Sequence, residues 1–210
     1  MLTHQNLVSN ALQLINLWNI DKSDTLIHAL PIYHTHGLFV AINTSMMSGA
    51  SIRFIKNFNI DLVIEAFKYS TLMMGVPTFY TRLIKDKRLD KSLTKDMKLF
   101  ISGSAPLLTE THQDFLNITG HQILERYGMT ETNMNTSNPF DGERKAGSVG
   151  KPLKDISIRI NKTKGDKDTV LNKIGMIEIK GHNVFKGYLN NPKKTQEAFT
   201  EDGYFITGDI

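Results

Sequence analysis

Short apolar segments alternate with segments of helical periodicity in the first part of the chain, and this alternation limits the folds open to it. The expected strands are residues 24–30, 51–55, 71–76 and 98–102. The expected helices are residues 3–18, 38–47, 61–67, 77–85 and a segment that starts at 109. Repeated strand–helix–strand units favour parallel strands. The sequence therefore predicts an α/β fold with a layered, mainly parallel sheet that is covered by helices.

Three residues are expected at helix starts. Thr3 and Asp61 are expected to cap helices, and Pro77 is expected as the first residue of another helix because its missing N–H has no partner to lose there. The residues expected to point largely inward from the helix after Asp61 are Leu62, Ile64, Ala66 and Phe67.

The spacing of the elements changes near residue 150. From there short strands at 157–160 and 176–180 alternate with polar turns, including one at 161–168, and a short helix is expected at 192–199. We therefore expect an α/β subdomain over residues 1–150 and a β-rich subdomain over residues 151–210.

The composition excludes several classes of protein. The chain of 210 residues has no Cys, which excludes disulfides and thiolate metal sites. Its formal charge is +4, and the basic residues are dispersed, so a nucleic-acid partner is not expected. No apolar run approaches the roughly 20 residues that a membrane span needs. The first residues lack the layout of a signal peptide, so we expect a cytoplasmic location, or an organellar matrix if a transit peptide precedes them.

The segment at residues 125–132 carries the most chemical information. Its sequence, Glu-Arg-Tyr-Gly-Met-Thr-Glu-Thr, combines an arginine, an aromatic ring, a hydroxyl and an acid. Such groups can hold an anionic substrate, a nucleotide and a metal ion at one place.

Four other segments complete an ordered set. They are Leu-Pro-Ile-Tyr-His-Thr-His-Gly at 30–37, Ser-Gly-Ser-Ala-Pro-Leu at 102–107, a Gly-Met-Ile-Glu-Ile-Lys-Gly run within 175–190, and Gly-Tyr-Phe-Ile-Thr-Gly-Asp at 203–209. With the segment at 125–132, they resemble the motifs of the adenylate-forming enzymes, which include the acyl-CoA synthetases. One such motif alone is weak evidence, but five in order over nearly the whole chain are specific.

The resemblance implies an enzyme that activates a carboxylic acid with ATP and passes the acyl group to CoA. It also implies that the β-rich part has the form of a distorted barrel. In adenylation a carboxylate attacks the α-phosphate and expels pyrophosphate. Negative charge accumulates in that transition state, so catalysis depends on positioning and on cationic and hydrogen-bonding groups.

The resemblance also implies a role for each matching residue. Glu131 is expected to bind Mg²⁺, Thr130 a phosphate oxygen, and Asp209 the ribose hydroxyls. Tyr127 is expected to face adenine, and the loop at Gly103 to let backbone approach the base. The full set expected around the nucleotide is Ser102, Gly103, Ser104, Ala105, Pro106, Glu125, Tyr127, Gly128, Met129, Thr130 and Asp209. As isolated residues, these would more often be a solvated acid, a capping threonine or a core tyrosine.

His34 and His36 lie two residues apart in an expected loop. The resemblance places His34 at the boundary between the acyl pocket and the thiol channel, as a substrate contact and a catalytic candidate beside Thr130 and Glu131. His36 stands where many relatives carry a small or apolar residue, which favours a polar acyl pocket. A metal site is the weaker alternative, because no third ligand lies nearby in sequence.

Arg126 is a second departure from the family pattern, because relatives that activate fatty or aromatic acids commonly carry Gly there. A buried arginine is costly unless an anion meets it, and its planar fork suits a carboxylate. We therefore expect Arg126 and His36 to bind the distal carboxylate of a short diacid. The structural alternative is an ion pair of Arg126 with Glu125, Glu131 or a surface acid.

The segments around His34 and Arg126, with the continuation at 133–141 and the run at 183–188, closely resemble malonyl-CoA synthetases. The resemblance implies malonate, ATP and CoA as substrates and a malonyl-adenylate intermediate. Methylmalonate or another short acid is an alternative, since one methyl group changes a pocket little. A non-catalytic nucleotide-binding or interaction module is an alternative of another class. The oligomeric state is not predicted.

Two parts of the family pattern have no counterpart in the sequence. The phosphate loop would precede residues 2–7, and the mobile C-terminal domain would follow Asp209. The chain is therefore expected to be an internal fragment of the large domain, inactive by itself.

Overall fold

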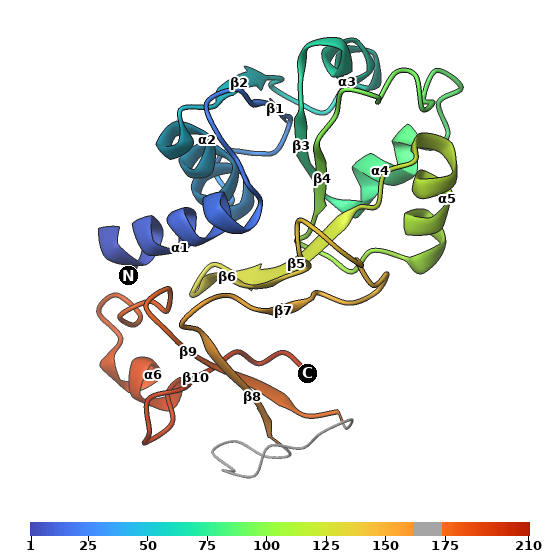
Figure 1. Ribbon diagram of the computed structural model, residues 1–210. Helices are drawn as coiled ribbons and strands as arrows, with labels where there is room; N and C mark the ends of the chain where they lie inside the picture. The colour runs from blue at the N-terminus through green and yellow to red at the C-terminus, as the bar shows by residue number, and fades with distance from the viewer. Residues whose placement is uncertain (162–173) are drawn as a thin grey trace.

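The computed structural model describes residues 1–161 and 174–210, which form two sheets (Figure 1). The larger sheet has seven strands in the order β2-β1-β3-β4-β5-β6-β7, and the smaller has three in the order β10-β9-β8. The predicted polar turn at 161–168 lies, apart from its first residue, outside the described residues.

The large sheet confirms the predicted mainly parallel architecture. Its strands are β1 (Thr25–His28), β2 (Ser51–Phe54), β3 (Leu72–Gly75), β4 (Leu99–Ser102), β5 (Leu124–Met129), β6 (Asn133–Ser137) and β7 (Lys151–Pro152). The first five pair in parallel, and β6 and β7 add to one edge in antiparallel fashion. The sequence does not predict β5, β6 or β7. In β6 the reason is that Asn-Met-Asn-Thr-Ser lacks apolar alternation, although all five residues are buried.

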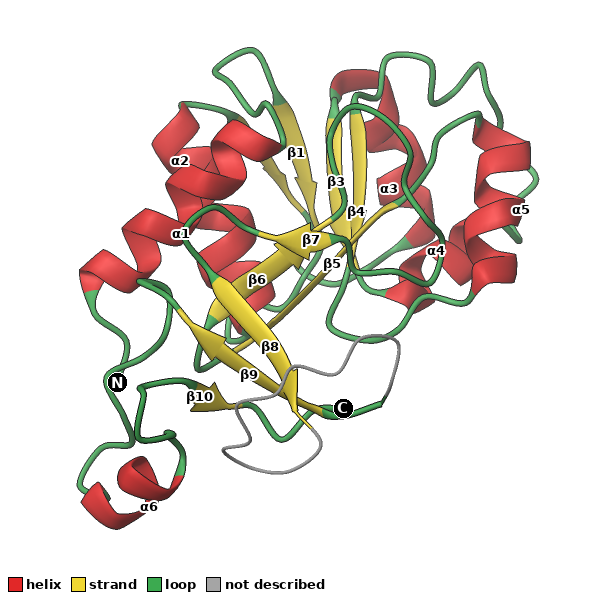
Figure 2. Ribbon diagram, turned by 60° about the horizontal axis from the view of Figure 1, so that its bottom comes forward, coloured by secondary structure: helices red, strands yellow, loops and turns green. Residues whose placement is uncertain are grey.

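Helices cover both faces of this sheet (Figures 1 and 2). One face carries α1 (His4–Leu17), the π-helical segment η1 (His36–Ile42) and α2 (Asn43–Ser48). The other carries α3 (Ile60–Ala66), the short 3₁₀ turn η2 (Phe67–Tyr69), α4 (Pro77–Leu83) and α5 (Thr109–Thr119). No helix in the described part of the chain is long and apolar enough to cross a membrane.

The helix starts confirm two predictions and correct one. Thr3 caps α1 by accepting a hydrogen bond from the Asn6 backbone, and Pro77 is the first residue of α4. The prediction that Asp61 caps α3 is wrong, because the helix begins earlier and Asn59 accepts from the Leu62 N–H at 3.0 Å. Leu62 is therefore turned outward and 56% exposed, whereas the other three residues predicted inward are buried.

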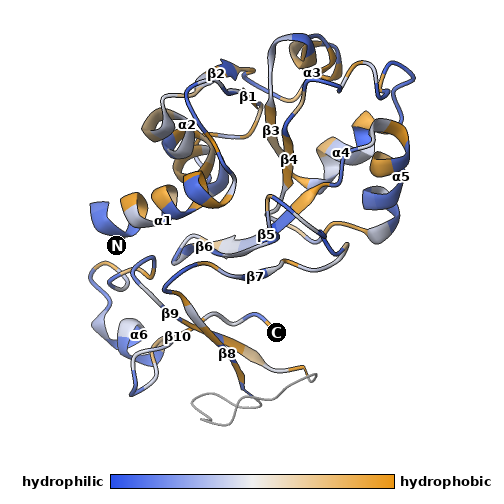
Figure 3. Ribbon diagram, viewed as in Figure 1, coloured by the Kyte–Doolittle hydropathy of each residue, from blue (hydrophilic) through white to orange (hydrophobic). Residues whose placement is uncertain are grey.

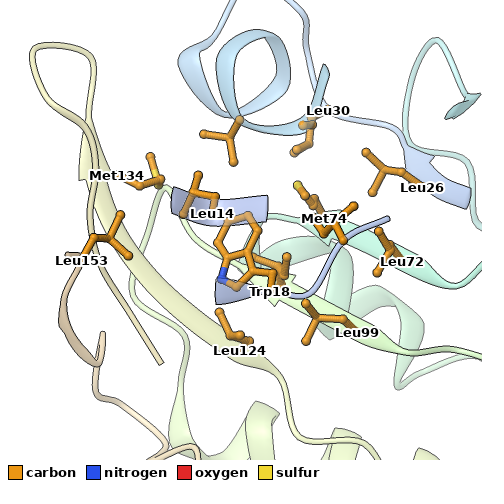
Figure 4. Packing of buried hydrophobic residues seen from close by; sticks show 14 of the residues in the cluster. Leu14, Trp18, Leu26, Leu30, Leu72, Met74, Leu99, Leu124, Met134 and Leu153 are labelled. Carbon is orange, nitrogen blue, oxygen red and sulfur yellow. The ribbon is translucent and has the colours of Figure 1, made fainter. Parts of the chain in front are cut away.

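Each covered face of the sheet has its own core. Trp18, which caps the C-terminal end of α1, is fully buried on the first face, and its Nε1 donates to Ser137 Oγ at 2.9 Å. Figure 4 shows the cluster around it, which includes Leu14, Leu26, Leu30, Leu72, Met74, Leu99 and Leu124. On the second face the rings of Tyr80, Phe100 and Phe115 meet edge to face. Strands β3 and β4 are accordingly hydrophobic along their length (Figure 3).

The smaller sheet confirms the predicted β-rich second part. It consists of β8 (Ser157–Asn161), β9 (Met176–Lys180) and β10 (Phe205–Ile206), with α6 (Pro192–Glu197) beside it. The described strands form an open antiparallel sheet, so the expected distorted barrel is corrected: three strands cannot close into a ring. The large sheet runs to Pro152, and the boundary near 150 stays a prediction.

Candidate active site

The loops that follow β1, β3, β4 and β5 meet at one edge of the large sheet. The order of the strands reverses between β1 and β3, which is where open α/β sheets bind ligands. A cavity of about 1110 Å³ opens there. Its lining includes eight of the residues predicted from the motifs: His34, His36, Ser104, Arg126, Gly128, Met129, Thr130 and Glu131.

The two histidines of the loop after β1 occupy different environments. His34 is exposed and its ring lies 4.6 Å from that of Tyr33. His36 begins η1 and is buried, and its Nδ1 lies 3.2 Å from Ser104 Oγ. Burial lowers the pKa of His36 well below its usual range, and the nearby positive charges of Arg126 and His28 act in the same direction. His36 is therefore neutral in the open pocket.

Arg126 is a buried cation beside the cavity, with 4% of its surface exposed. Burial lowers the pKa of its guanidinium to about 10, so it stays charged at neutral pH. Within residues 1–161 and 174–210, its Nε and Nη2 have no hydrogen-bond partner.

The acids that could have paired with Arg126 are engaged elsewhere. Glu125 Oε1 accepts from the Gly147 N–H at 2.8 Å and lies 3.8 Å from His112 Nδ1. Glu131 Oε1 accepts from the Tyr188 hydroxyl at 3.2 Å. The structural alternative, an ion pair with Glu125 or Glu131, is thus not seen among the described residues.

The turn between β5 and β6 presents Thr130 and Glu131 to the cavity. Thr130 is exposed, and its hydroxyl accepts from that of Thr35 at 3.4 Å, so the turn and the loop after β1 touch. In the described part of the chain, no three His, Asp or Glu side chains converge as a protein-only metal site.

Tyr127 and Asp209 lie together beyond this turn, although 82 positions separate them in sequence. The Tyr127 hydroxyl donates to Asp209 Oδ2 at 2.5 Å. Burial raises the pKa of Tyr127, and the negative charge of Asp209 raises it further. The ring packs against the core, whereas Asp209 is exposed.

The remaining predicted residues lie around the end of β4 and behind β5. Ser102 and Gly103 are buried, and Ala105 and Pro106 are exposed on the loop that follows. Glu125 is buried on the α5 side of the sheet, away from the cavity lining.

Sequence reasoning missed one wall of the cavity. Phe54 and Lys56 come from the end of β2 and the loop after it, and Phe58 stacks on Phe79 of α4 with ring centroids 4.1 Å apart. These residues form no local motif, because separate elements bring them together.

The comparisons with known proteins agree with this geometry. The family model described as AMP-binding enzyme matches residues 1–189. A malonate–CoA ligase of Arabidopsis thaliana is 37% identical over 227 residues, covering 99% of this chain and 37% of the relative. The mitochondrial malonate–CoA ligase ACSF3 of Mus musculus is 34% identical and covers 99% of this chain and 41% of the relative.

Solved structures show the same relationship. The ATP-bound MatB from Rhodopseudomonas palustris has a TM-score of 0.97 and 54% identity, covering 99% of this chain and 41% of that protein. A malonyl-CoA ligase in a ternary product complex with methylmalonyl-CoA and AMP has a TM-score of 0.89 and 36% identity. The match covers 99% of this chain and 45% of that protein. The chain thus spans 37% to 45% of the length of these four relatives. With its fold, its ordered motifs and its family match in agreement, the chain belongs to the AMP-binding enzyme family.

Proposed function

We propose that this chain supplies the acyl and nucleotide sites of an ATP-dependent acid–thiol ligase that forms malonyl-CoA from malonate, ATP and CoA. The observation that carries the proposal is Arg126, a buried cation at the cavity whose Nε and Nη2 are unpaired in the described part of the chain. A buried charge is stable only when an anion or strong acceptors meet it, so the substrate is expected to supply the anion.

A dicarboxylate fits this arrangement better than a fatty acid. One carboxylate would accept from the guanidinium of Arg126, with His36 and the hydroxyl of Ser104 close by. The other carboxylate would then point to the turn of Thr130, where the α-phosphate of ATP is attacked. A fatty acid would leave Arg126 unpaired against an alkyl chain.

The nucleotide would lie between the turn after β5 and the end of β10. Tyr127 offers a ring face to adenine, Asp209 accepts from the ribose hydroxyls, and Thr130 donates to a phosphate oxygen. His34, exposed at the cavity, is assigned to the approach of the CoA thiol.

The donor set at Glu131 fits a magnesium ion. Mg²⁺ in nucleotide enzymes is commonly held by one or two carboxylates together with phosphate oxygens, so a single acid at the cavity suffices. When bound, the ion would neutralise charge on the phosphates during adenylation. Tyr188 donates to Glu131 and fixes the direction of its carboxylate.

The relatives support the same substrate class. Two of them are named malonate–CoA ligases, and the product complex of a third contains methylmalonyl-CoA and AMP. Methylmalonate is therefore a second candidate acid. The cytoplasmic location stays a prediction.

The test uses the full-length protein, meaning the product of the complete reading frame that encodes residues 1–210. AMP formation is measured with ATP and CoA and with malonate, methylmalonate, acetate or octanoate. We expect kcat/KM for malonate or methylmalonate to exceed that for acetate and octanoate by about 10-fold or more, the effect of one charge-assisted hydrogen bond in a buried site. A preference for octanoate, or no AMP with any acid, contradicts the proposal.

A further inference from the structure

The register of the large sheet places Gly103 beside Arg126. Ser102 pairs with Gly75 of β3 on one side and with Glu125 of β5 on the other. Successive residues of a strand lie on opposite faces of the sheet, so Gly103, directly after β4, and Arg126 of β5 follow this pair side by side on the face opposite to Glu125. Of the two, Arg126 lines the cavity. The side chain of Arg126 therefore shares its space with whatever side chain stands at position 103.

The space at position 103 is filled by the guanidinium. A Cβ built on Gly103 would lie 2.3 Å from Cζ of Arg126 and 2.5 Å from its Nε and Nη1. Such separations are far below van der Waals contact. The φ angle of Gly103 lies outside the left-handed region, so alanine could adopt the same backbone. Room for Arg126, rather than backbone freedom, is what requires glycine here.

We propose that Gly103 is a specificity-determining residue, because its missing side chain lets the Arg126 guanidinium lie where it binds the distal carboxylate of the substrate. This inference rests on the proposed function, since it takes Arg126 as the carboxylate ligand. Gly103 itself touches no substrate in this scheme and acts through Arg126.

A methyl group at position 103 would displace the guanidinium of Arg126 and leave the surrounding backbone in place. The backbone of Gly103 is fixed, since its N–H donates to the Gly75 carbonyl at 3.3 Å. The guanidinium is the far end of a flexible side chain, and it is the part that gives way. The guanidinium of Arg126 would then keep its charge but change its orientation. Its two parallel N–H groups would no longer align with the two oxygens of a carboxylate.

The sequence-based role of Gly103 predicts a different effect. If this glycine lets the backbone approach adenine, a methyl group there should weaken ATP binding for every acid substrate. If it makes room for Arg126, the methyl group should weaken recognition of the diacid and leave ATP binding intact.

The experiment compares Gly103→Ala, Arg126→Gly and the double variant with the unchanged full-length protein. The kcat/KM values for malonate and acetate and the KM for ATP are measured. We expect Gly103→Ala to lower the malonate-to-acetate ratio by about 10-fold or more, with the KM for ATP changed by less than about 3-fold. In the Arg126→Gly background, Gly103→Ala should change the ratio by less than about 2-fold, since the group it displaces is gone.

The outcomes separate this inference from the proposed function. If Arg126→Gly leaves the ratio unchanged, the proposed carboxylate site fails. If Arg126→Gly lowers the ratio but Gly103→Ala does not, or if Gly103→Ala raises the KM for ATP instead, the inference about Gly103 fails while the proposed function stands. Gly75→Ala is a matched control on the neighbouring strand, where a built Cβ would meet Phe79 Cδ2 at 3.1 Å. An equal fall of the ratio in that control would overturn a specific role for Gly103.

Discussion

Asp209 shows how the fold fixes a single exposed residue. Its carboxylate accepts from the Tyr127 hydroxyl at 2.5 Å, and its backbone N–H donates to Thr207 Oγ1 at 3.0 Å. Its carbonyl accepts from the Ile177 N–H at 2.9 Å. Because the ring of Tyr127 is packed against the core, its hydroxyl is a fixed donor. An acid held in this way loses little conformational entropy when it binds a ribose.

We therefore predict that Tyr127→Phe raises the KM for ATP by about 3- to 10-fold, the effect of one hydrogen bond, with little change in kcat. The phenyl ring keeps the face offered to adenine, so the substitution removes only the hydrogen bond from the Tyr127 hydroxyl to the Asp209 carboxylate. The measurement is repeated with 2′,3′-dideoxy-ATP, which has no ribose hydroxyls for Asp209 to meet. A loss of the same size with that analogue would show that the hydroxyl of Tyr127 does not act through Asp209.

At the scale of one element, α1 is more than an amphipathic helix with an apolar stripe. Asn6 and Asn10 are buried on the face that meets the sheets. The amide of Asn10 donates to the Met134 carbonyl at 2.8 Å and accepts from its N–H at 3.1 Å, as a neighbouring strand would. Asn6 donates to the carbonyl of His182 at 2.6 Å. The helix thus joins β6 to the loop after β9.

Asn10→Ala is expected to lower the free energy of unfolding by about 1–3 kcal/mol, because it leaves the buried N–H of Met134 without its partner, whereas the Met134 carbonyl keeps the Asn183 amide at 3.3 Å. Asn16→Ala on the exposed side of the same helix is the matched control, with an expected change within about 0.5 kcal/mol. Denaturant unfolding of both variants measures the difference. Equal effects would show that the Asn10 contact contributes nothing beyond helix propensity.

At the scale of the whole molecule, the charged and titratable groups of the cavity interact with a histidine in the core beneath it. His36 lies at the cavity, and the fully buried His28 lies close enough for its charge to lower the pKa of His36. Burial lowers the pKa of His28 as well. Both rings are therefore neutral next to the charged guanidinium of Arg126.

This burial predicts acid sensitivity of the fold. A histidine in the unfolded chain has a pKa of about 6.5, so below that pH the unfolded state binds protons that the folded state excludes. Stability is complete above about pH 6.5 and falls as the pH drops from there towards the lower folded-state pKa values. The expected loss is up to about 1.4 kcal/mol per pH unit for each histidine.

Thermal unfolding at pH 7.5 and 5.5 measures this dependence. His36→Gln should reduce the fall in Tm between the two pH values, whereas His4→Gln, at an exposed position, should leave it unchanged. An unaltered pH dependence in His36→Gln would contradict the assignment to His36.

The order of apolar segments and the five motifs were sufficient to predict the parallel sheet, the helices that cover it and the kind of chemistry at its edge. These features depend on residues that are close in sequence, where periodicity and capping act. Even so, the sequence does not distinguish Asp61 from Asn59 as the cap of α3, because both residue types cap helices and the first turn can begin after either.

Three features were decided by the tertiary structure alone. Polar strand β6 is buried because α1 and its neighbouring strands supply partners for its backbone and side chains. Tyr127 meets Asp209 across the two sheets, and Arg126 lies over Gly103 through the register of β4 and β5. The physical reason is the same in each case: strand register and sheet packing set these contacts, and both are properties of the whole fold rather than of any local segment. The sequence by itself determined which groups the site contains, and the fold determined which of them touch.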